Sequence, residues 1–131
     1  MMGKKDKANF SIISTLPVLD YKALIFIRLL EFCEANGIKI ELVNHFERQI
    51  LGCLKYETGT FRCSRPVIQI LNRKECVALP WVLAHEVGHF IAINTYNDNS
   101  EKGADTEAKR FCLSYCNIED SILRYCFPLS Y

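Results

Sequence analysis

The sequence predicts a small α+β domain in which one helix precedes a three-stranded sheet and three further helices follow it. The chain has 131 residues, about the length of one domain. Half of the residues are hydrophobic, enough for a packed core. Helical and strand periodicities succeed one another without an internal repeat or a long linker. We therefore expect a single domain over residues 16–131, preceded by a polar arm over residues 1–15.

The first predicted helix runs from Tyr21 to about Ala35. Asp20 is a good N-cap before it, and Asn36-Gly37 is a strong stop after it. Apolar residues recur at helical spacing in this stretch, which predicts an amphipathic helix lying on the core. The positions expected to face the core are Ala23, Phe26, Leu29, Leu30 and Cys33.

Three short segments are typical of strands. Over Ile38–Leu42 apolar and charged residues alternate, which is the period-two pattern of a half-buried strand. A second strand is expected around Ile50–Tyr56, and Val67–Leu71 forms the third after a turn.

Helices are expected to fill the rest of the chain. Pro80 opens a helix in which Trp81–Ile93 is apolar on nearly every side, so this helix is predicted to be buried. After a polar loop, a third helix is expected over about Ala104–Cys116. A short final helix over Ile118–Phe127 is then ended by Pro128.

The charge balance argues against a general nucleic-acid binder. Sixteen Lys and Arg face fifteen Asp and Glu, so the net charge is +1. Such a chain lacks the bulk positive charge that attracts nucleic acid. No signal-peptide pattern and no apolar run of about 20 residues occurs, so we expect a cytoplasmic protein that does not enter a membrane.

The seven cysteines predict packing more than chemistry. An odd count cannot pair completely, and no C-x-x-C motif occurs. Cys112 and Cys116 lie one helical turn apart and could supply two metal ligands, but free cysteine is commonly a small buried residue. We therefore expect reduced thiols.

An H-E-x-x-H motif lies within the buried helix. His85 and His89 share one helix face, so their imidazoles can bind one metal ion. Glu86 lies next to them and can act on a metal-bound water. Since isolated polar side chains in such an apolar helix would cost several kcal/mol, a bound metal is the favoured partner. We expect one Zn²⁺ per chain, with Glu86 as the catalytic residue.

The third ligand is left open by the residue pattern. His45 lies upstream and is the weaker candidate, because a ligand on the following helix is commoner. On that helix, Asp105 and Glu107 each lie roughly 80° from the centre of the apolar face, on opposite sides. Gly88 also has two interpretations: it admits a second backbone or a substrate strand, or it serves close packing alone.

The H-E-x-x-H motif and the acidic segment on the following helix resemble two motifs of the ImmA/IrrE metallo-endopeptidases. His85-Glu86-Val87-Gly88-His89 matches the family's H-E-x-G-H, and the segment from Ala104 to Cys112 is similar to its second motif, E-x-E-A-[ND]-x-F-A. The resemblance implies a minimal zincin-like domain with Asp105 as third zinc ligand and Glu107 as the alternative. It departs from the family pattern at Asp105, where glutamate is usual, at Lys109, and after Cys112.

The resemblance further implies an endopeptidase that cleaves a helix-turn-helix repressor and so regulates genes of a mobile element or a stress response. A zinc-bound water would attack the peptide bond with Glu86 as general base. Candidates to stabilise the oxyanion are Tyr96, Tyr115 and Arg110. Substrate is expected to bind as an extended strand along a sheet edge. The alternative is a non-catalytic, metal-stabilised module that sequesters a regulatory protein; neither hypothesis requires direct nucleic-acid or membrane binding.

Overall fold

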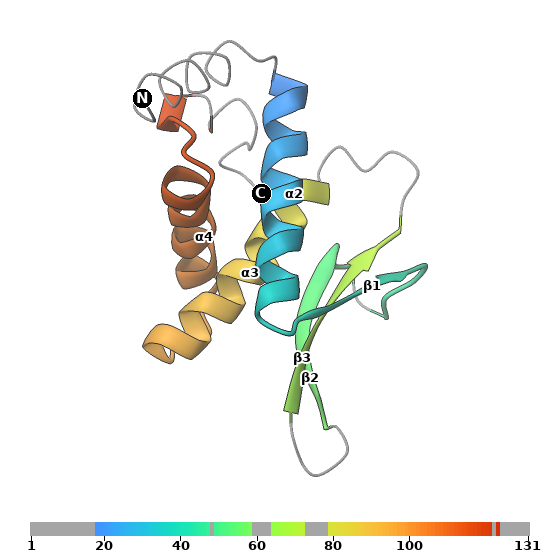
Figure 1. Cartoon of the computed structure of the whole chain (residues 1–131). Helices are drawn as coiled ribbons and strands as arrows, with labels where there is room; N and C mark the ends of the chain where they lie inside the picture. The colour runs from blue at the N-terminus through green and yellow to red at the C-terminus, as the bar shows by residue number, and fades with distance from the viewer. Residues whose placement is uncertain (1–17, 48, 59–63, 73–78, 122, 124–131) are drawn as a thin grey trace.

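Helices and strands follow one another in the predicted order. The structure is a computed structural model that describes residues 18–47, 49–58, 64–72, 79–121 and 123. Helix α2 is followed by three strands, by helices α3 and α4, and by a π-helical turn η2 (Figure 1). Their bounds are α2 Val18–Ala35, β1 Lys39–Val43, β2 Gly52–Thr58, β3 Ser64–Leu71, α3 Leu79–Tyr96, α4 Glu101–Arg110 and η2 Phe111–Tyr115. The α+β class with a small three-stranded sheet is confirmed.

The sheet is mixed and places β2 at one edge. Its order is β1-β3-β2, with β1 parallel to β3 and β2 antiparallel to β3. Leu54 pairs with Ile68 and Gly52 with Ile70, and both partners belong to the buried core. This face of the sheet therefore packs on the helices. Within the described residues, no strand pairs with the outer edge of β2.

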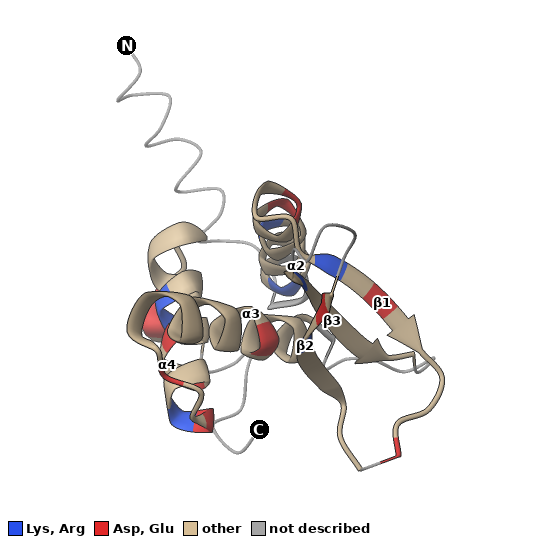
Figure 2. Cartoon of the chain, turned by 90° about the horizontal axis from the view of Figure 1, so that it is seen from below, with Lys and Arg blue, Asp and Glu red and all other residues tan. Residues whose placement is uncertain are grey.

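Helix α3 is the centre of the core. Every residue from Trp81 to Gly88 is buried, as predicted from a helix that is apolar on nearly every side. Figure 2 shows why: α3 lies between α4 on one side and β2 on the other, and α2 also packs against it. The motif residues are thereby carried into the interior on a fixed helix.

Helix α2 differs from its prediction in its start and in its buried face. It begins at Val18, so Asp20 lies inside its first turn instead of preceding it. The buried stripe consists of Tyr21, Ile25, Leu29 and Cys33, each one turn after the last. Ala23 and Leu30 are exposed, because they lie off the i, i+4 row through which the helix rests on the core.

The stop after α2 is confirmed in detail. Gly37 adopts a left-handed φ of 68°, and the Ile38 N–H donates to the Cys33 carbonyl at 2.9 Å. This is the usual way in which a glycine ends a helix, because it lacks the Cβ that disfavours this conformation.

Helix α4 begins earlier than predicted, at Glu101. The Ser100 side chain accepts the Gly103 N–H at 3.0 Å, and the Asp98 side chain accepts the Ser100 N–H at 2.9 Å. This N-cap starts the helix within the segment expected to be a loop. The predicted arm (1–15) and half of the predicted final helix lie outside the described residues.

Four cysteines fall in the described part of the chain: Cys33, Cys53, Cys112 and Cys116. Cys112 and Cys116 are buried in the core, as expected of packing residues. None of the helices described here has the length and apolar character to span a bilayer.

Gly88 allows α3 and α4 to pack with their backbones in contact. A Cβ at this position would lie 2.9 Å from the Ala104 carbonyl carbon and 3.1 Å from the Ala108 nitrogen. Real Cβ atoms do not approach backbone this closely, and backbone atoms cannot rotate away as a side chain can. Of the two interpretations of Gly88, the structure therefore supports close packing, with the backbone of α4 as the partner.

Gly88→Ala is expected to destabilise the fold. In an exposed helix this change stabilises by about 1 kcal/mol, but here the methyl group would push α4 away from α3 and lower the free energy of unfolding by about 1–3 kcal/mol. Urea denaturation of the metal-free protein measures this. A variant as stable as the wild type, or more stable, would contradict the packing argument.

Candidate metal centre

The two motif histidines face one another one turn apart on α3. Their ring centroids are 4.8 Å apart and the ring planes stand at 89°. His85 is buried and His89 is half-buried. The helical spacing of the motif, fixed by the burial of α3, therefore brings the two imidazoles together as predicted.

Glu101 supplies the third converging group. Its Oε2 atom lies 2.6 Å from Nε2 of His85 and 3.1 Å from Nε2 of His89. One ligand atom from each of the three residues lies within 4.8 Å of the other two. The Glu101 side chain is 79% exposed, so the centre opens to solvent on this side.

Asp105 holds His85 from the opposite edge of the ring. Its Oδ1 lies 2.8 Å from Nδ1 of His85. An imidazole whose proton is on Nδ1 donates it to Asp105 and keeps the Nε2 lone pair for a metal ion. Metal-binding histidines commonly have such a carboxylate on their other nitrogen. Asp105 therefore positions His85, and its carboxylate is directed to the ring nitrogen away from the centre.

The geometry brings to the two histidines a carboxylate, Glu101, that was not among the candidates drawn from the sequence. The family resemblance favoured Asp105 as the third ligand, with Glu107 as the alternative, and the helix was expected to begin at about Ala104. Helix α4 begins one turn earlier, and Glu101 and Asp105 then share a face at i and i+4. Glu107 is buried elsewhere and accepts from Nη1 of Arg110 at 2.7 Å. The N-cap Ser100 was the signal that could have identified Glu101.

The donor set fits a transition-metal ion. Two imidazole nitrogens and one carboxylate oxygen form one of the sets used by catalytic zinc sites, which leave a fourth position open. Partial burial alone would raise the Glu101 pKa, but hydrogen bonds and charge from His85 and His89 hold it below its usual value. The carboxylate form that binds metal is thus favoured. These residues can hold a metal ion, and the geometry does not choose the element.

Glu86 lies beside the three ligands and is buried. Only 5% of its surface is exposed. Burial raises its pKa to about 7; the nearby His85 charge opposes this shift and Glu101 adds to it. A carboxyl group with this pKa exchanges a proton readily near neutral pH.

The centre opens into a groove between α3 and the edge strand β2. The groove has a volume of about 740 Å³. His85, Glu86, His89 and Glu101 lie along it. The rest of its wall is largely apolar and comes from the segment around β2 and from the end of α3: Ile50, Leu51, Gly52, Cys53, Leu54, Tyr56, Ile93 and Asn99.

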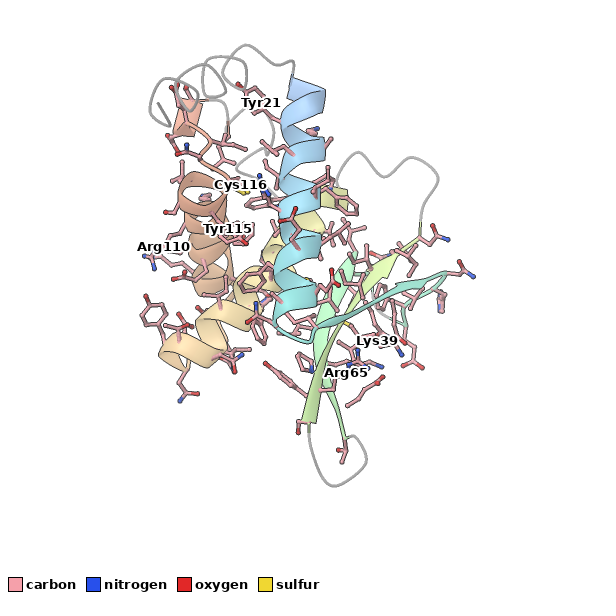
Figure 3. All side chains as sticks on the ribbon, viewed as in Figure 1. Tyr21, Lys39, Arg65, Arg110, Tyr115 and Cys116 are labelled. Atoms are coloured by element: carbon pink, nitrogen blue, oxygen red, sulfur yellow. The ribbon has the colours of Figure 1, made fainter. Side chains whose placement is uncertain are left out.

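The oxyanion candidates lie away from this groove. Nη1 of Arg110 donates to the Tyr96 hydroxyl at 3.2 Å, and Tyr115 stacks on Phe111 at 4.7 Å between ring centroids. Figure 3 shows the Arg110 side chain on the side of α4 that faces away from the sheet. None of the three candidates lines the groove. His45 is exposed and lines a second hollow of about 460 Å³ instead of joining the centre.

Comparisons with protein-family models, with curated proteins and with solved structures found no match to this chain. The resemblance to the ImmA/IrrE enzymes therefore remains a hypothesis that rests on the two sequence motifs.

Three substitutions distinguish the candidate ligands. Glu101→Gln removes a charged ligand and should cause the largest loss of zinc affinity. Asp105→Asn should weaken binding by about 10- to 100-fold, because it disturbs the orientation of His85. Glu107→Gln is the matched control and should leave affinity unchanged. Competition with a chelating dye measures all three, and a Glu107 effect larger than that of Glu101 would contradict the assignment.

In the metal-free protein, the burial of Glu86 should make the free energy of unfolding depend on pH. The pKa of Glu86 is about 7 in the folded protein, and the ordinary value is 4.5. The stability that the neutral carboxyl contributes to the folded state is therefore fully present below about pH 4.5 and is lost as the pH rises through 7. The metal-free Glu86→Gln variant should therefore gain up to about 3 kcal/mol relative to wild type between pH 4.5 and pH 8. Urea denaturation with a chelator present tests this; an equal difference at both pH values would refute it.

Proposed function

We propose that this protein is a zinc-dependent endopeptidase whose metal is held by His85, His89 and Glu101. The observation that carries the proposal is the buried Glu86 carboxyl group, placed in the same groove as three converging ligands. Structural zinc sites are closed by four protein ligands. A site with three protein ligands, an open fourth position and an ionisable side chain beside it is typical of catalytic zinc sites.

Each residue of the centre has a defined part in peptide hydrolysis. When bound, the zinc ion would supply the Lewis acidity that activates water and polarises the scissile carbonyl. Glu86 accepts the proton of the attacking water and returns it to the leaving amine. Burial of Glu86 keeps this carboxyl away from bulk water and beside the open ligand position. Asp105 holds the His85 ring in place while this happens.

The edge of β2 supports binding of an extended peptide. The Leu71 N–H donates to the Leu51 carbonyl at 2.8 Å, which marks this pair as hydrogen-bonded across the two strands. In an antiparallel ladder such pairs alternate with pairs whose backbone groups point outward. Gly52, Leu54 and Tyr56 therefore direct their N–H and C=O groups to the free edge. A substrate strand can add there and lie along the groove.

The substrate class follows from the motif resemblance. We propose a helix-turn-helix repressor cleaved in the cytoplasm, since the near-zero net charge suits an enzyme acting on a DNA-binding protein more than on DNA. The alternative is a module that only sequesters a partner; it is favoured by the short side chain of Asp105 and by the departure from the family pattern after Cys112. Glu101 offers the longer carboxylate that this argument lacked.

Glu86→Gln tests catalysis directly. The variant keeps all three proposed ligands, so it should bind zinc as the wild type does, while cleavage of a helix-turn-helix repressor substrate should fall by about 10²–10⁴-fold. The exposed Glu119→Gln serves as control and should cleave normally. Gel and mass-spectrometric detection of the product decide the outcome. Equal cleavage by the Glu86 variant would refute the mechanism, and binding without any cleavage by wild type would favour sequestration.

A further inference from the structure

The groove beside the metal centre is narrow at one end and wide at the other. At Gly52, β2 lies so close to α3 that a Cβ would be 2.7 Å from Cγ1 of Val82 and 3.4 Å from Cγ of Glu86. Four residues further along the strand, a whole tyrosine side chain spans the gap: the Tyr56 hydroxyl accepts from Nδ2 of Asn94 at 3.1 Å. The strand and the helix therefore diverge from Gly52 toward Tyr56.

The wide end has an apolar lining and a fixed far wall. Leu54 and Tyr56 contribute from the strand and Ile93 from the helix. Nδ2 of Asn94 also donates to the Phe90 carbonyl at 2.8 Å, which anchors the wall to α3. The ionisable groups nearest along the groove are the carboxyls Glu86 and Glu101 and the two histidines. An acidic ligand side chain would thus meet like charge at the carboxyl groups, whereas an apolar one would be desolvated on three sides.

A peptide added to β2 would direct one side chain into this space. Residues opposite one another on paired strands share a face of the sheet. The partner of Leu54 would therefore present its side chain on the helix-facing side, in the wide part of the groove. The partner of Gly52 would lie at the narrow end of the groove, where Val82 and Glu86 of α3 lie close to the strand.

We propose that Leu54, Tyr56 and Ile93 form a specificity pocket for a branched aliphatic or aromatic side chain of the bound peptide, closed at its far end by the hydrogen bond between Tyr56 and Asn94. This inference rests on the proposed binding of peptide substrates in the groove. It adds a substrate preference that neither the H-E-x-x-H motif nor the ligand set implies. Ile93 is a specificity residue here and has no part in the hydrolysis itself.

A small-molecule titration tests the pocket without requiring catalysis. The zinc-loaded Glu86→Gln protein, with labelled methyl groups, is titrated with N-acetyl-leucinamide and N-acetyl-alaninamide and followed by NMR. The leucine probe should bind at least about tenfold more tightly than the alanine probe, with the largest shifts at the methyls of Leu54 and Ile93. Equal affinities, shifts centred elsewhere, or no binding of either probe would overturn the proposal.

The Ile93→Ala substitution, added to the Glu86→Gln protein, tests whether Ile93 forms the pocket. It should reduce the leucine preference to about threefold or less, because the helix side of the pocket is lost. Ile27→Ala, at an exposed isoleucine on α2, is the matched control and should leave the preference unchanged. An unchanged preference in the Ile93 variant would remove the pocket from this position.

Cleavage of a positional-scanning peptide library by the wild type separates this inference from the proposed function. Cleavage without any side-chain preference would refute the pocket and leave the peptidase activity standing. Leucine binding at Ile93 combined with no cleavage of library or repressor would support the pocket and refute the activity.

Discussion

The close contact between Gly88 and the backbone of α4 determines the geometry of the centre. It sets the separation of the two helices that carry the candidate ligands. With the helices this close, the first turn of α4 lies over the motif, and Glu101 and Asp105 reach opposite nitrogens of His85. A longer separation would leave both carboxylates short of the ring. The N-cap at Ser100 completes the arrangement, because it makes Glu101 the first residue of a regular helix. The contact at Gly88 therefore determines both how α3 and α4 pack and where Glu101 and Asp105 lie relative to His85.

The same burial that stabilises α3 also produces its chemical character. The helix is enclosed by α2, α4 and the sheet, so Glu86 is withdrawn from water and its pKa rises to about 7. Glu101, by contrast, is largely exposed, and the groove is open. A buried proton acceptor beside an accessible candidate metal site is the combination that the proposed hydrolysis requires. The edge strand β2 then adds a backbone on which a peptide can be aligned.

Much of this could be predicted from the sequence, and the differences have physical causes. The buried helix was evident because Trp81–Ile93 is apolar on nearly every side, and the H-E-x-x-H spacing alone placed two histidines together. The approach of Glu101 to the histidines was not predicted because it depends on where α4 begins, and a polar loop differs from a capped helix start only in the hydrogen bond of Ser100. The oxyanion candidates Tyr96, Tyr115 and Arg110 failed to reach the groove because helical periodicity fixes a face of a helix but not the direction in which that helix packs. The divergence of β2 from α3 lies beyond any sequence pattern, since it depends on the crossing of two elements distant in the chain.

The central claim is that one metal ion is bound by His85, His89 and Glu101, and anomalous diffraction from crystals of the zinc-loaded protein tests it most directly. The account predicts a single strong peak at the zinc absorption edge, about 2.0–2.2 Å from Nε2 of both histidines and from a Glu101 carboxylate oxygen. Asp105 should remain hydrogen-bonded to Nδ1 of His85. A peak bound by Asp105 or Glu107 in place of Glu101, a peak at Cys112 and Cys116, or no peak at the motif would contradict it.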